Sequence, residues 1–383
     1  MKKYLLAGLG AFALCVLIVT LWFLRVLSNL PDVSVLKHYR PAAAADVLAR
    51  DGSLLTQYYD RKFRIWVPIS GLPDLVVNAV VTAEDDTFFE HHGVNFKATR
   101  DALIHDVQKR RLARGGSTIT QQMIKNVLLS REKTITRKVR EYVLARKAEE
   151  ILSKHRILEI YLNEVEWGDN VYGIEAASRF YLNKHTSELT VAEAALLAGM
   201  LPNPHYYNPY KRLNKAKARQ EQVLFNMQQA NFITQDEYAA ALRSSLDLRQ
   251  EGSSRSGLSS IATGSGRPCY YHALEQILVS VIGEQELYHS GRTVKTTLDK
   301  SLQNELGNWE GSTQERAAEP LGHILVVKQG GQIRAIVCGE GSEALVHSKL
   351  GSFGETPGGY DVGAIDPVEI TREQIILAPV GEK

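Results

Sequence analysis

A single uncharged apolar run near the N-terminus limits what this 383-residue chain can fold into. Residues 4–24, YLLAGLGAFALCVLIVTLWFL, contain no charged side chain; Lys2 and Lys3 precede the run and Arg25 follows it. Helical residues rise ~1.5 Å each, so this run is about 32 Å long and can cross a ~30 Å hydrocarbon core. It therefore predicts a transmembrane helix within residues 1–30.

A cleaved signal peptide is the alternative interpretation of this run. Signal peptides usually have an apolar core of about 7–15 residues, with small residues close behind it. The run in this chain is longer, and LRVLSNLP follows it. We therefore expect an uncleaved anchor, and the flanking lysines favour an N-terminus inside the cell and the remaining chain outside.

Charge and cysteine content argue against several function classes. Lys and Arg number 45 against 43 Asp and Glu, so the overall charge indicates no nucleic-acid partner. The cysteines are Cys15, Cys269 and Cys338, and no CxxC pair is present. A disulfide framework or a zinc ribbon is therefore not expected, while a single bridge between Cys269 and Cys338 remains open.

Apolar spacing divides the remainder of the chain into segments. Residues 31–70 predict an extended, β-type connector with a DG turn, and residues 71–250 show strong helical spacing. Residues 251–268 are rich in Gly and Ser, as linkers are. Residues 269–383 predict a helix and then strands, including a hairpin through a GG turn. The predicted fold class is mostly α, with an N-terminal transmembrane helix and a small C-terminal α/β region.

The stretch AEDDTFFEHHG, residues 83–93, contains the first candidate site residues. A helix that ends at Glu84 would place this carboxylate at the negative end of the helix dipole, beside Asp85. Like charge and partial burial raise the pKa of a carboxylate, which suits a general acid or base near neutral pH. A solvated acidic turn is the plainer alternative. A weaker one is a metal site of carboxylates and imidazoles, formed by Asp86, Glu90, His91 and His92.

A glycine pair begins the second stretch, RGGSTITQQMIKN at residues 114–126. The two glycines allow close approach of a ligand, and Thr118 with Gln121 predicts a capping box. A capped helix N-terminus after glycines is a natural anion site, and Lys125 lies one turn beyond Gln121 on the same face. An ordinary loop with a cap explains this stretch equally well.

Basic residues surround one glutamate in the third stretch, residues 131–150. Lys133, Arg137 and Lys138 precede Glu141. Arg137 and Glu141 share a helix face because they are four residues apart. Such a cluster fits a diphosphate, with or without a bridging divalent ion. A surface helix with several ion pairs is the alternative.

Together these stretches resemble the peptidoglycan glycosyltransferase domain (glycosyltransferase family 51). This is the transglycosylase domain of class A penicillin-binding proteins and of monofunctional glycosyltransferases. The resemblance covers about residues 70–235. Five motifs carry it in order: EDxxFxxHxG from Glu84 to Gly93, GGSTxTQQ and its KN from Gly115 to Asn126, RKxxE from Arg137 to Glu141, KxxILExYLN from Lys154 to Asn163, and RxxxVL from Arg219 to Leu224.

The resemblance implies a lysozyme-like fold of two lobes that polymerises lipid II, a disaccharide-pentapeptide on undecaprenyl diphosphate. The product would be a β-1,4-linked glycan strand, with release of undecaprenyl diphosphate. By resemblance, Glu84 is the general base and Glu141 assists at the diphosphate, where Mg or Mn is the expected ion and no organic cofactor is implied. The residues assigned to the substrate are Asp85, Phe88, His91, Ser117, Thr118, Gln121, Gln122, Lys125, Lys133, Arg137 and Lys138.

A lipid-linked substrate also makes the bilayer a partner. Residues 94–113 mix apolar and basic positions, which suits a segment in the membrane interface, although a plain amphipathic surface helix fits as well. We expect a single-pass protein of the bacterial cytoplasmic membrane with its catalytic domain on the outer face. Other cell-wall synthesis or division proteins are further expected partners.

The C-terminal region departs from the bifunctional pattern of the family. Residues 291–339 resemble the lead-in to a transpeptidase domain, yet no SxxK, SxN or KTG motif follows residue 291 in this sequence. We therefore expect a monofunctional polymerase. One alternative is a lysozyme-like hydrolase or lytic transglycosylase, against which the basic cluster and the GGSTITQQ loop argue. Another is a scaffold that recruits cell-wall enzymes through residues 251–383, against which Glu84 and Glu141 argue.

Overall fold

The computed structural model describes residues 2–59, 62–96, 116–130, 132, 134–249, 258–260, 269–307, 324–338, 361–364 and 370–376. Several sequence predictions fall on other residues. Gly115, Lys133, most of the interfacial segment 94–113 and most of the Gly/Ser-rich linker 251–268 lie outside the described residues. The side chains of Cys269 and Cys338 lie outside them as well.

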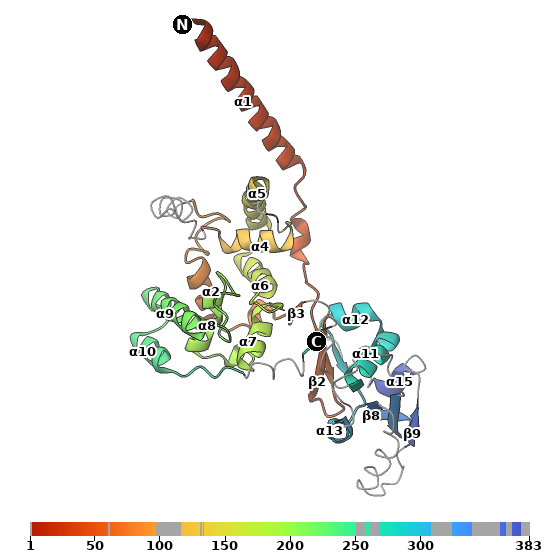
Figure 1. Cartoon of the computed structure of the whole chain (residues 1–383). Helices are drawn as coiled ribbons and strands as arrows, with labels where there is room; N and C mark the ends of the chain where they lie inside the picture. The colour runs from red at the N-terminus through yellow and green to blue at the C-terminus, as the bar shows by residue number, and fades with distance from the viewer. Residues whose placement is uncertain are drawn as a thin grey trace.

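The N-terminal apolar run forms α1 (Lys2–Ser28), as the sequence predicts. Leu9–Ser28 is the one helix in the described part of the chain that is long and apolar enough to cross a membrane, and 6% of it is buried. The helix projects away from the rest of the protein (Figure 1). At its foot Val26 is buried, where α1 meets α5. The anchor is thus packed directly onto the folded part of the chain.

Two groups of helices build a domain around one apolar core. The first group contains α4 (Ile119–Val127), α5 (Ile135–Ile151) and α6 (Lys154–Glu164). The second contains α2 (Asp74–Glu84), α8 (Val191–Met200), α9 (Leu213–Gln229) and α10 (Gln235–Arg243), and α7 (Ile174–Leu182) contacts both groups. The predicted fold class, a mostly helical domain of two lobes behind an N-terminal helix, is confirmed.

Short elements connect these helices. They are η1 (Ser34–Lys37), η2 (Ile69–Gly71), η3 (Thr186–Glu188), and the strands β3 (Phe63–Arg64) and β4 (Val171–Tyr172). The two strands pair in parallel. Arg64 of β3 is buried, and its guanidinium lies 3.0 Å from Glu164, which also accepts a hydrogen bond from Tyr39 at 2.5 Å. These three side chains fix the segment after α1 to the end of α6.

Polar caps fix where the helices begin. Thr118 and Gln121 form the predicted capping box at the start of α4, with a hydrogen bond of 3.1 Å in each direction. Thr190 and Glu193 form a second capping box, at the start of α8. Each such cap satisfies backbone N–H groups that the helix leaves unpaired and contributes about 1 kcal/mol. The first residue of α4, and so the direction of its side chains, is thereby set.

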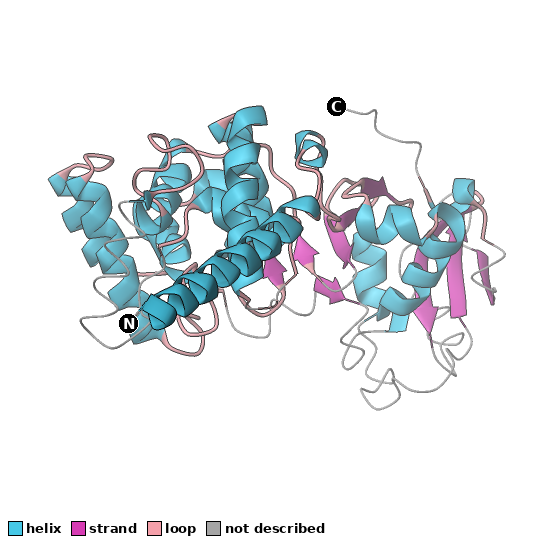
Figure 2. Cartoon of the chain, turned by 90° about the horizontal axis from the view of Figure 1, so that it is seen from above, coloured by secondary structure: helices cyan, strands magenta, loops and turns pink. Residues whose placement is uncertain are grey.

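Strands from distant parts of the sequence form a separate α/β unit. One sheet has the order β5-β2-β1-β6 and contains β1 (Ala45–Leu48), β2 (Leu54–Tyr59), β5 (Leu258–Ser260) and β6 (Thr293–Lys295). The second sheet has the order β8-β7-β9 and contains β7 (Ile324–Gln329), β8 (Gln332–Cys338) and β9 (Asp361–Ala364). Figure 2 shows this unit, which holds most of the strands, beside the helical domain.

Helices cover these sheets. They are α11 (Cys269–Ile282), α12 (Glu284–His289), α13 (Lys300–Gly307) and α15 (Arg372–Ile375). The predicted single helix after residue 268 is divided at Gly283, whose φ of 84° ends α11. The predicted GG hairpin is present between β7 and β8, where Gly330 and Gly331 both have positive φ. Positive φ at both turn residues is the reason glycine is favoured there.

The predicted connector, residues 31–70, supplies two of the strands of this unit. Tyr58 on β2 is fully buried against α11 and α12, together with Val47 on β1, and its hydroxyl donates to the carbonyl of Tyr271 at 2.7 Å. The DG turn predicted from the sequence joins β1 to β2. The chain therefore begins the α/β unit before it enters the helical domain and completes it afterwards.

Candidate active site

Glu84 lies where the two groups of helices meet. It is the last residue of α2, and its Oε2 accepts a hydrogen bond of 2.8 Å from Nε2 of Gln122 on α4. Burial raises the pKa of Glu84, whereas the bond from Gln122 and the charges of Arg219 and Lys125 lower it. Asp85 adds only a small further rise. The predicted direction is therefore confirmed, but burial, rather than the neighbouring aspartates, is its main cause.

Asp85, the residue after Glu84, forms a pair with His91. The Nε2 of His91 lies 2.9 Å from Oδ2 of Asp85, and the backbone N–H of Ile119 donates to the same carboxylate at 2.9 Å. The Nδ1 of His91 accepts from the N–H of Gly93 at 3.2 Å. Because Nδ1 is an acceptor, the proton of a neutral His91 lies on Nε2 and faces Asp85. The pair connects the end of α2 to the beginning of α4.

Phe88 fills the space beneath this pair and is fully buried. Its ring lies 6.1 Å from that of His91. The Nζ of Lys154, the first residue of α6, lies 4.5 Å from the centroid of the Phe88 ring. Lys154 also donates to the carbonyl of His91 at 2.6 Å and to Glu149 at 2.8 Å. The first and fourth motifs therefore meet around one buried ring, and Glu149 of α5 joins them through Lys154.

Gly93 ends this stretch in a conformation that favours glycine. Its φ is 84°, and a Cβ atom added there would lie 2.7 Å from the carbonyl oxygen of Ala145 on α5. The carbonyl of Gly93 in turn accepts from the hydroxyl of Thr118 at 2.7 Å. Close contact of the loop with both α4 and α5 thus depends on this glycine.

A basic group lies on α5, beside the start of α4. Glu141 is buried and forms ion pairs with both Arg137 and Lys138, the latter at 3.0 Å. Lys138 also donates to the hydroxyl of Ser117 at 2.7 Å. Desolvation, followed by the charges of Arg137 and Lys125, lowers the pKa of Lys138. Positive charge is therefore concentrated between α4 and α5, where it can offset a bound anion.

The carboxylates of this region do not fit a divalent ion held by the protein. Mg²⁺ and Mn²⁺ prefer oxygen ligands with little competing positive charge. Glu141 is instead neutralised by Arg137 and Lys138. Within the described residues there is no group of three or more His, Cys, Asp or Glu side chains that could hold a metal, including around Asp86, Glu90, His91 and His92.

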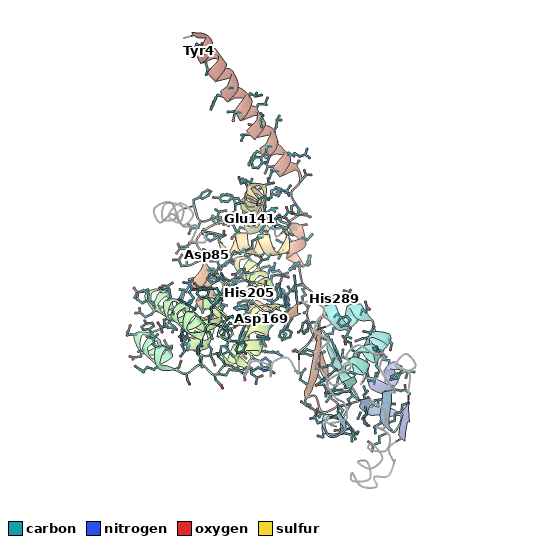
Figure 3. The ribbon with its side chains drawn as sticks, in the orientation of Figure 1. Tyr4, Asp85, Glu141, Asp169, His205 and His289 are labelled. Atoms are coloured by element: carbon teal, nitrogen blue, oxygen red, sulfur yellow. The ribbon has the colours of Figure 1, made fainter. Side chains whose placement is uncertain are left out.

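The structure divides the residues predicted from sequence into two sets. One set borders the junction of the helix groups and the basic group: Glu84, Ser117, Gln122, Lys125, Arg137, Lys138 and Glu141. The other set holds the loop that follows α2 against α4: Asp85, Phe88, His91, Thr118 and Gln121. Asp85 and Glu141 both lie in the part of the helical domain nearest α1 (Figure 3).

Two residues near Glu84 received no role from the sequence. Arg219 on α9 lies close enough to lower the pKa of Glu84, and Tyr161 on α6 donates to Gln122. Both belong to recognised motifs, RxxxVL and KxxILExYLN. Helical spacing places them on the inward faces of their helices, but it does not show which other helix each one meets.

Comparison with known proteins agrees with these motifs. Residues 51–228 match the sequence model of the family described as Transglycosylase. Penicillin-binding protein 1A of Rickettsia prowazekii is 33% identical over 310 residues, which is 79% of this chain and 38% of that protein. Penicillin-binding protein 1A of Aquifex aeolicus is 37% identical over 251 residues, 66% of this chain and 34% of that protein.

This chain spans little more than a third of the length of these relatives. A crystal structure of penicillin-binding protein 1A from Haemophilus influenzae shares 23% identity, covering 70% of this chain and 29% of that one. Its TM-score of 0.38 is too low for the arrangement of the two chains to be compared.

Proposed function

Residues 51–228 belong to the transglycosylase family, glycosyltransferase family 51, and from this premise we propose that the protein is a membrane-anchored glycan polymerase. Its substrate is lipid II, and its product is a β-1,4-linked glycan strand. Undecaprenyl diphosphate is released. No transpeptidase activity is proposed for residues 291–383, because they contain no SxxK, SxN or KTG motif.

The observation that carries the proposal is the position of Glu84. Its carboxylate is held by Gln122 at 2.8 Å, and it lies close to the cations Lys125 and Arg219. The charge of Lys125 also lowers the pKa of Lys138 in the basic group, so Lys125 lies near both the base and that group. A base with a raised pKa and a site for an anionic leaving group thus adjoin each other. Transfer of a sugar from a diphosphate requires both.

Glu84 acts as the general base in this mechanism. It takes the proton from the 4-hydroxyl of the acceptor sugar while that oxygen attacks the anomeric carbon of the donor. The bond between the anomeric carbon and the diphosphate oxygen breaks, the electron pair leaves with the diphosphate, and the configuration inverts. Burial raises the pKa of Glu84, which makes the carboxylate a stronger base near neutral pH.

Arg137, Lys138 and Lys125 stabilise the charge that develops on the leaving diphosphate. Fixed cations of this kind contribute more in a partly desolvated site than they would in water. Glu141 orders Arg137 and Lys138 through its ion pairs with them. Because Glu141 is already neutralised, a Mg²⁺ or Mn²⁺ ion that takes part would be held by the oxygens of the diphosphate rather than by this carboxylate.

The membrane anchor brings the site to its lipid-linked substrate. The foot of α1 packs against α5, the helix that carries the basic group. We propose that the protein crosses the bacterial cytoplasmic membrane once and that its folded part lies on the outer face. The basic group then lies near the headgroups, where the diphosphate of lipid II is found.

Polymerisation of labelled lipid II by the detergent-solubilised full chain tests the proposal. Polymer that lysozyme digests is expected from the wild type but not from Glu84→Gln. Glu90→Gln, which changes an exposed glutamate in the same stretch, is the matched control and should polymerise normally. Polymer from Glu84→Gln would exclude Glu84 as the base. Glycan cleavage in place of polymerisation would favour a hydrolase, and folded protein with neither activity would favour a scaffold.

A further inference from the structure

Tyr161 is a buried side chain that the proposed mechanism does not use. It lies on α6 with no exposed surface, and its hydroxyl donates to Oε1 of Gln122 at 3.4 Å. The Nε2 of the same amide donates to Oε2 of Glu84 at 2.8 Å. Tyrosine, glutamine and glutamate thus form a chain of hydrogen bonds that ends at the base.

The direction of this chain depends on the orientation of the Gln122 amide. An ionised carboxylate can only accept, so the NH₂ group of Gln122 must face Glu84 while the carboxylate is charged. The Oε1 atom then points towards Tyr161 and needs a donor. Burial and the nearby charges of Glu84 and Asp85 raise the pKa of Tyr161, so its hydroxyl keeps its proton and remains that donor.

We propose that Tyr161 is a positioning residue, which holds the amide of Gln122 in the orientation that donates to Glu84. A flipped amide would direct Oε1 at the carboxylate and would favour a protonated Glu84, which cannot act as a base. Tyr161 therefore acts on the proton affinity of the base without touching the substrate. The inference rests on the proposed function only in that Glu84 must be the base for this effect to appear in the rate.

Other groups also act on Glu84, so the effect of the tyrosine must be separated from theirs. In the described residues these groups are Arg219 from α9, Lys125 from α4 and the adjacent Asp85. None of them is changed when only the hydroxyl of Tyr161 is removed. Tyr161→Phe therefore isolates the orientation of the amide, and Gln122→Ala removes the amide itself.

The experiment compares the pH dependence of polymerisation for the wild type, Tyr161→Phe, Gln122→Ala and the double variant. The acid limb of kcat should move upwards by about half a pH unit to one unit in Tyr161→Phe, because the Gln122 amide is no longer held in the orientation that donates to the charged form. The KM for lipid II should change less than about twofold, since the hydroxyl has no exposed surface and is bonded to Gln122. The double variant should show the same shift as Gln122→Ala alone, because both residues act through one bond.

Tyr181→Phe is the matched control. Tyr181 is another buried tyrosine of the helical domain, and its hydroxyl donates to the carbonyl of Trp167 at 2.8 Å. Its loss should lower the thermal stability but leave the acid limb in place. Titration of ¹³C-labelled glutamate carboxyl carbons by NMR, with Glu84 assigned by its absence from Glu84→Gln, follows the same pKa without any polymerisation.

These measurements separate the two proposals. A raised pKa of Glu84 in Tyr161→Phe by NMR supports the inference even if the chain forms no polymer, a result that would count against the proposed function alone. A wild-type acid limb and an unchanged Glu84 titration in Tyr161→Phe, with a shift in Gln122→Ala, would overturn the inference and leave Tyr161 a purely packing role. Shifts that add in the double variant would also overturn it.

Discussion

The carboxylate of Asp85 accepts a hydrogen bond from the backbone N–H of Ile119, 2.9 Å away, and so connects the last turn of α2 to the first turn of α4. Glu84 directly precedes Asp85, and Gln122 lies three positions after Ile119. The 2.8 Å bond between Glu84 and Gln122 therefore depends on a neighbouring bond that is buried.

Replacing Asp85 tests this dependence. Asp85→Ala should lower the free energy of unfolding by about 2–4 kcal/mol, because it leaves the N–H of Ile119 and the imidazole of His91 without their acceptor. The rate of polymerisation should fall at least about tenfold with it. Asp86→Ala changes the adjacent, exposed aspartate and should alter stability by less than about 0.5 kcal/mol. Chemical denaturation measures both, and equal effects of the two substitutions would contradict the structural role of Asp85.

Glu84→Gln should make the protein more stable while it abolishes polymerisation. Because burial raises the pKa of Glu84, the folded state binds more protons than the unfolded state between the two pKa values. Stability therefore falls as the pH rises through that interval, and the penalty is full above the folded pKa. A neutral amide removes it, so the Tm near about pH 8 should rise by roughly 2–4 °C. The gain should disappear below about pH 4, where both forms are uncharged; a lower Tm at high pH would contradict the argument.

Gly93→Ala, in the helical domain, should cost more stability than Gly52→Ala, in the turn between β1 and β2. Both glycines have positive φ, 84° and 87° respectively, so the backbone cost of about 1–2 kcal/mol is shared. An added Cβ at Gly93 would meet the carbonyl oxygen of Ala145 at 2.7 Å, whereas nothing lies within 4 Å at Gly52. We expect a loss of about 2–4 kcal/mol for Gly93→Ala in a denaturant titration. Similar losses for both variants would mean that the contact with α5 relaxes freely.

Lys138→Met should reduce kcat/KM for lipid II by about 10- to 100-fold, since it removes one cation from the proposed diphosphate site. Lys147→Met changes an exposed lysine on the same helix and should stay within about twofold of the wild type. Inhibition by inorganic pyrophosphate should weaken in parallel with the loss of Lys138. If both lysines had the same effect, the charge of α5 as a whole, rather than a site at Lys138, would be responsible.

Local features of the site were predictable from the sequence because they depend on near neighbours. The end of α2 at Glu84, the capping box of Thr118 and Gln121, and the pair of Arg137 and Glu141 all follow from spacings of three or four residues. A motif letter does not specify burial, so the spacing alone does not show that the carboxylate of Asp85 accepts from the backbone of Ile119. The approach of Tyr161 and Arg219 to Glu84 depends on how three helices pack, and periodicity within one helix does not contain that information.

The α/β unit shows the same limit over a longer distance. The predicted connector forms strands because its residues favour them, but their partners, β5 and β6, come from beyond the helical domain. Nothing in the spacing of residues 31–70 indicates which distant segment completes the sheet. Tertiary pairing, rather than local preference, decides that these residues belong to the second unit.

This pairing also determines the order in which the protein can be assembled as it is synthesised. The hydroxyl of Thr296 donates to the carbonyl of Leu48 across 248 positions of sequence, so the hairpin emerges from the ribosome long before its partners. The helical domain between them can close first, while the strand edges of the hairpin stay unpaired and open to wrong partners. The part of the fold that is translated soon after the anchor is therefore completed last, and its early strands are where a nascent chain most needs protection.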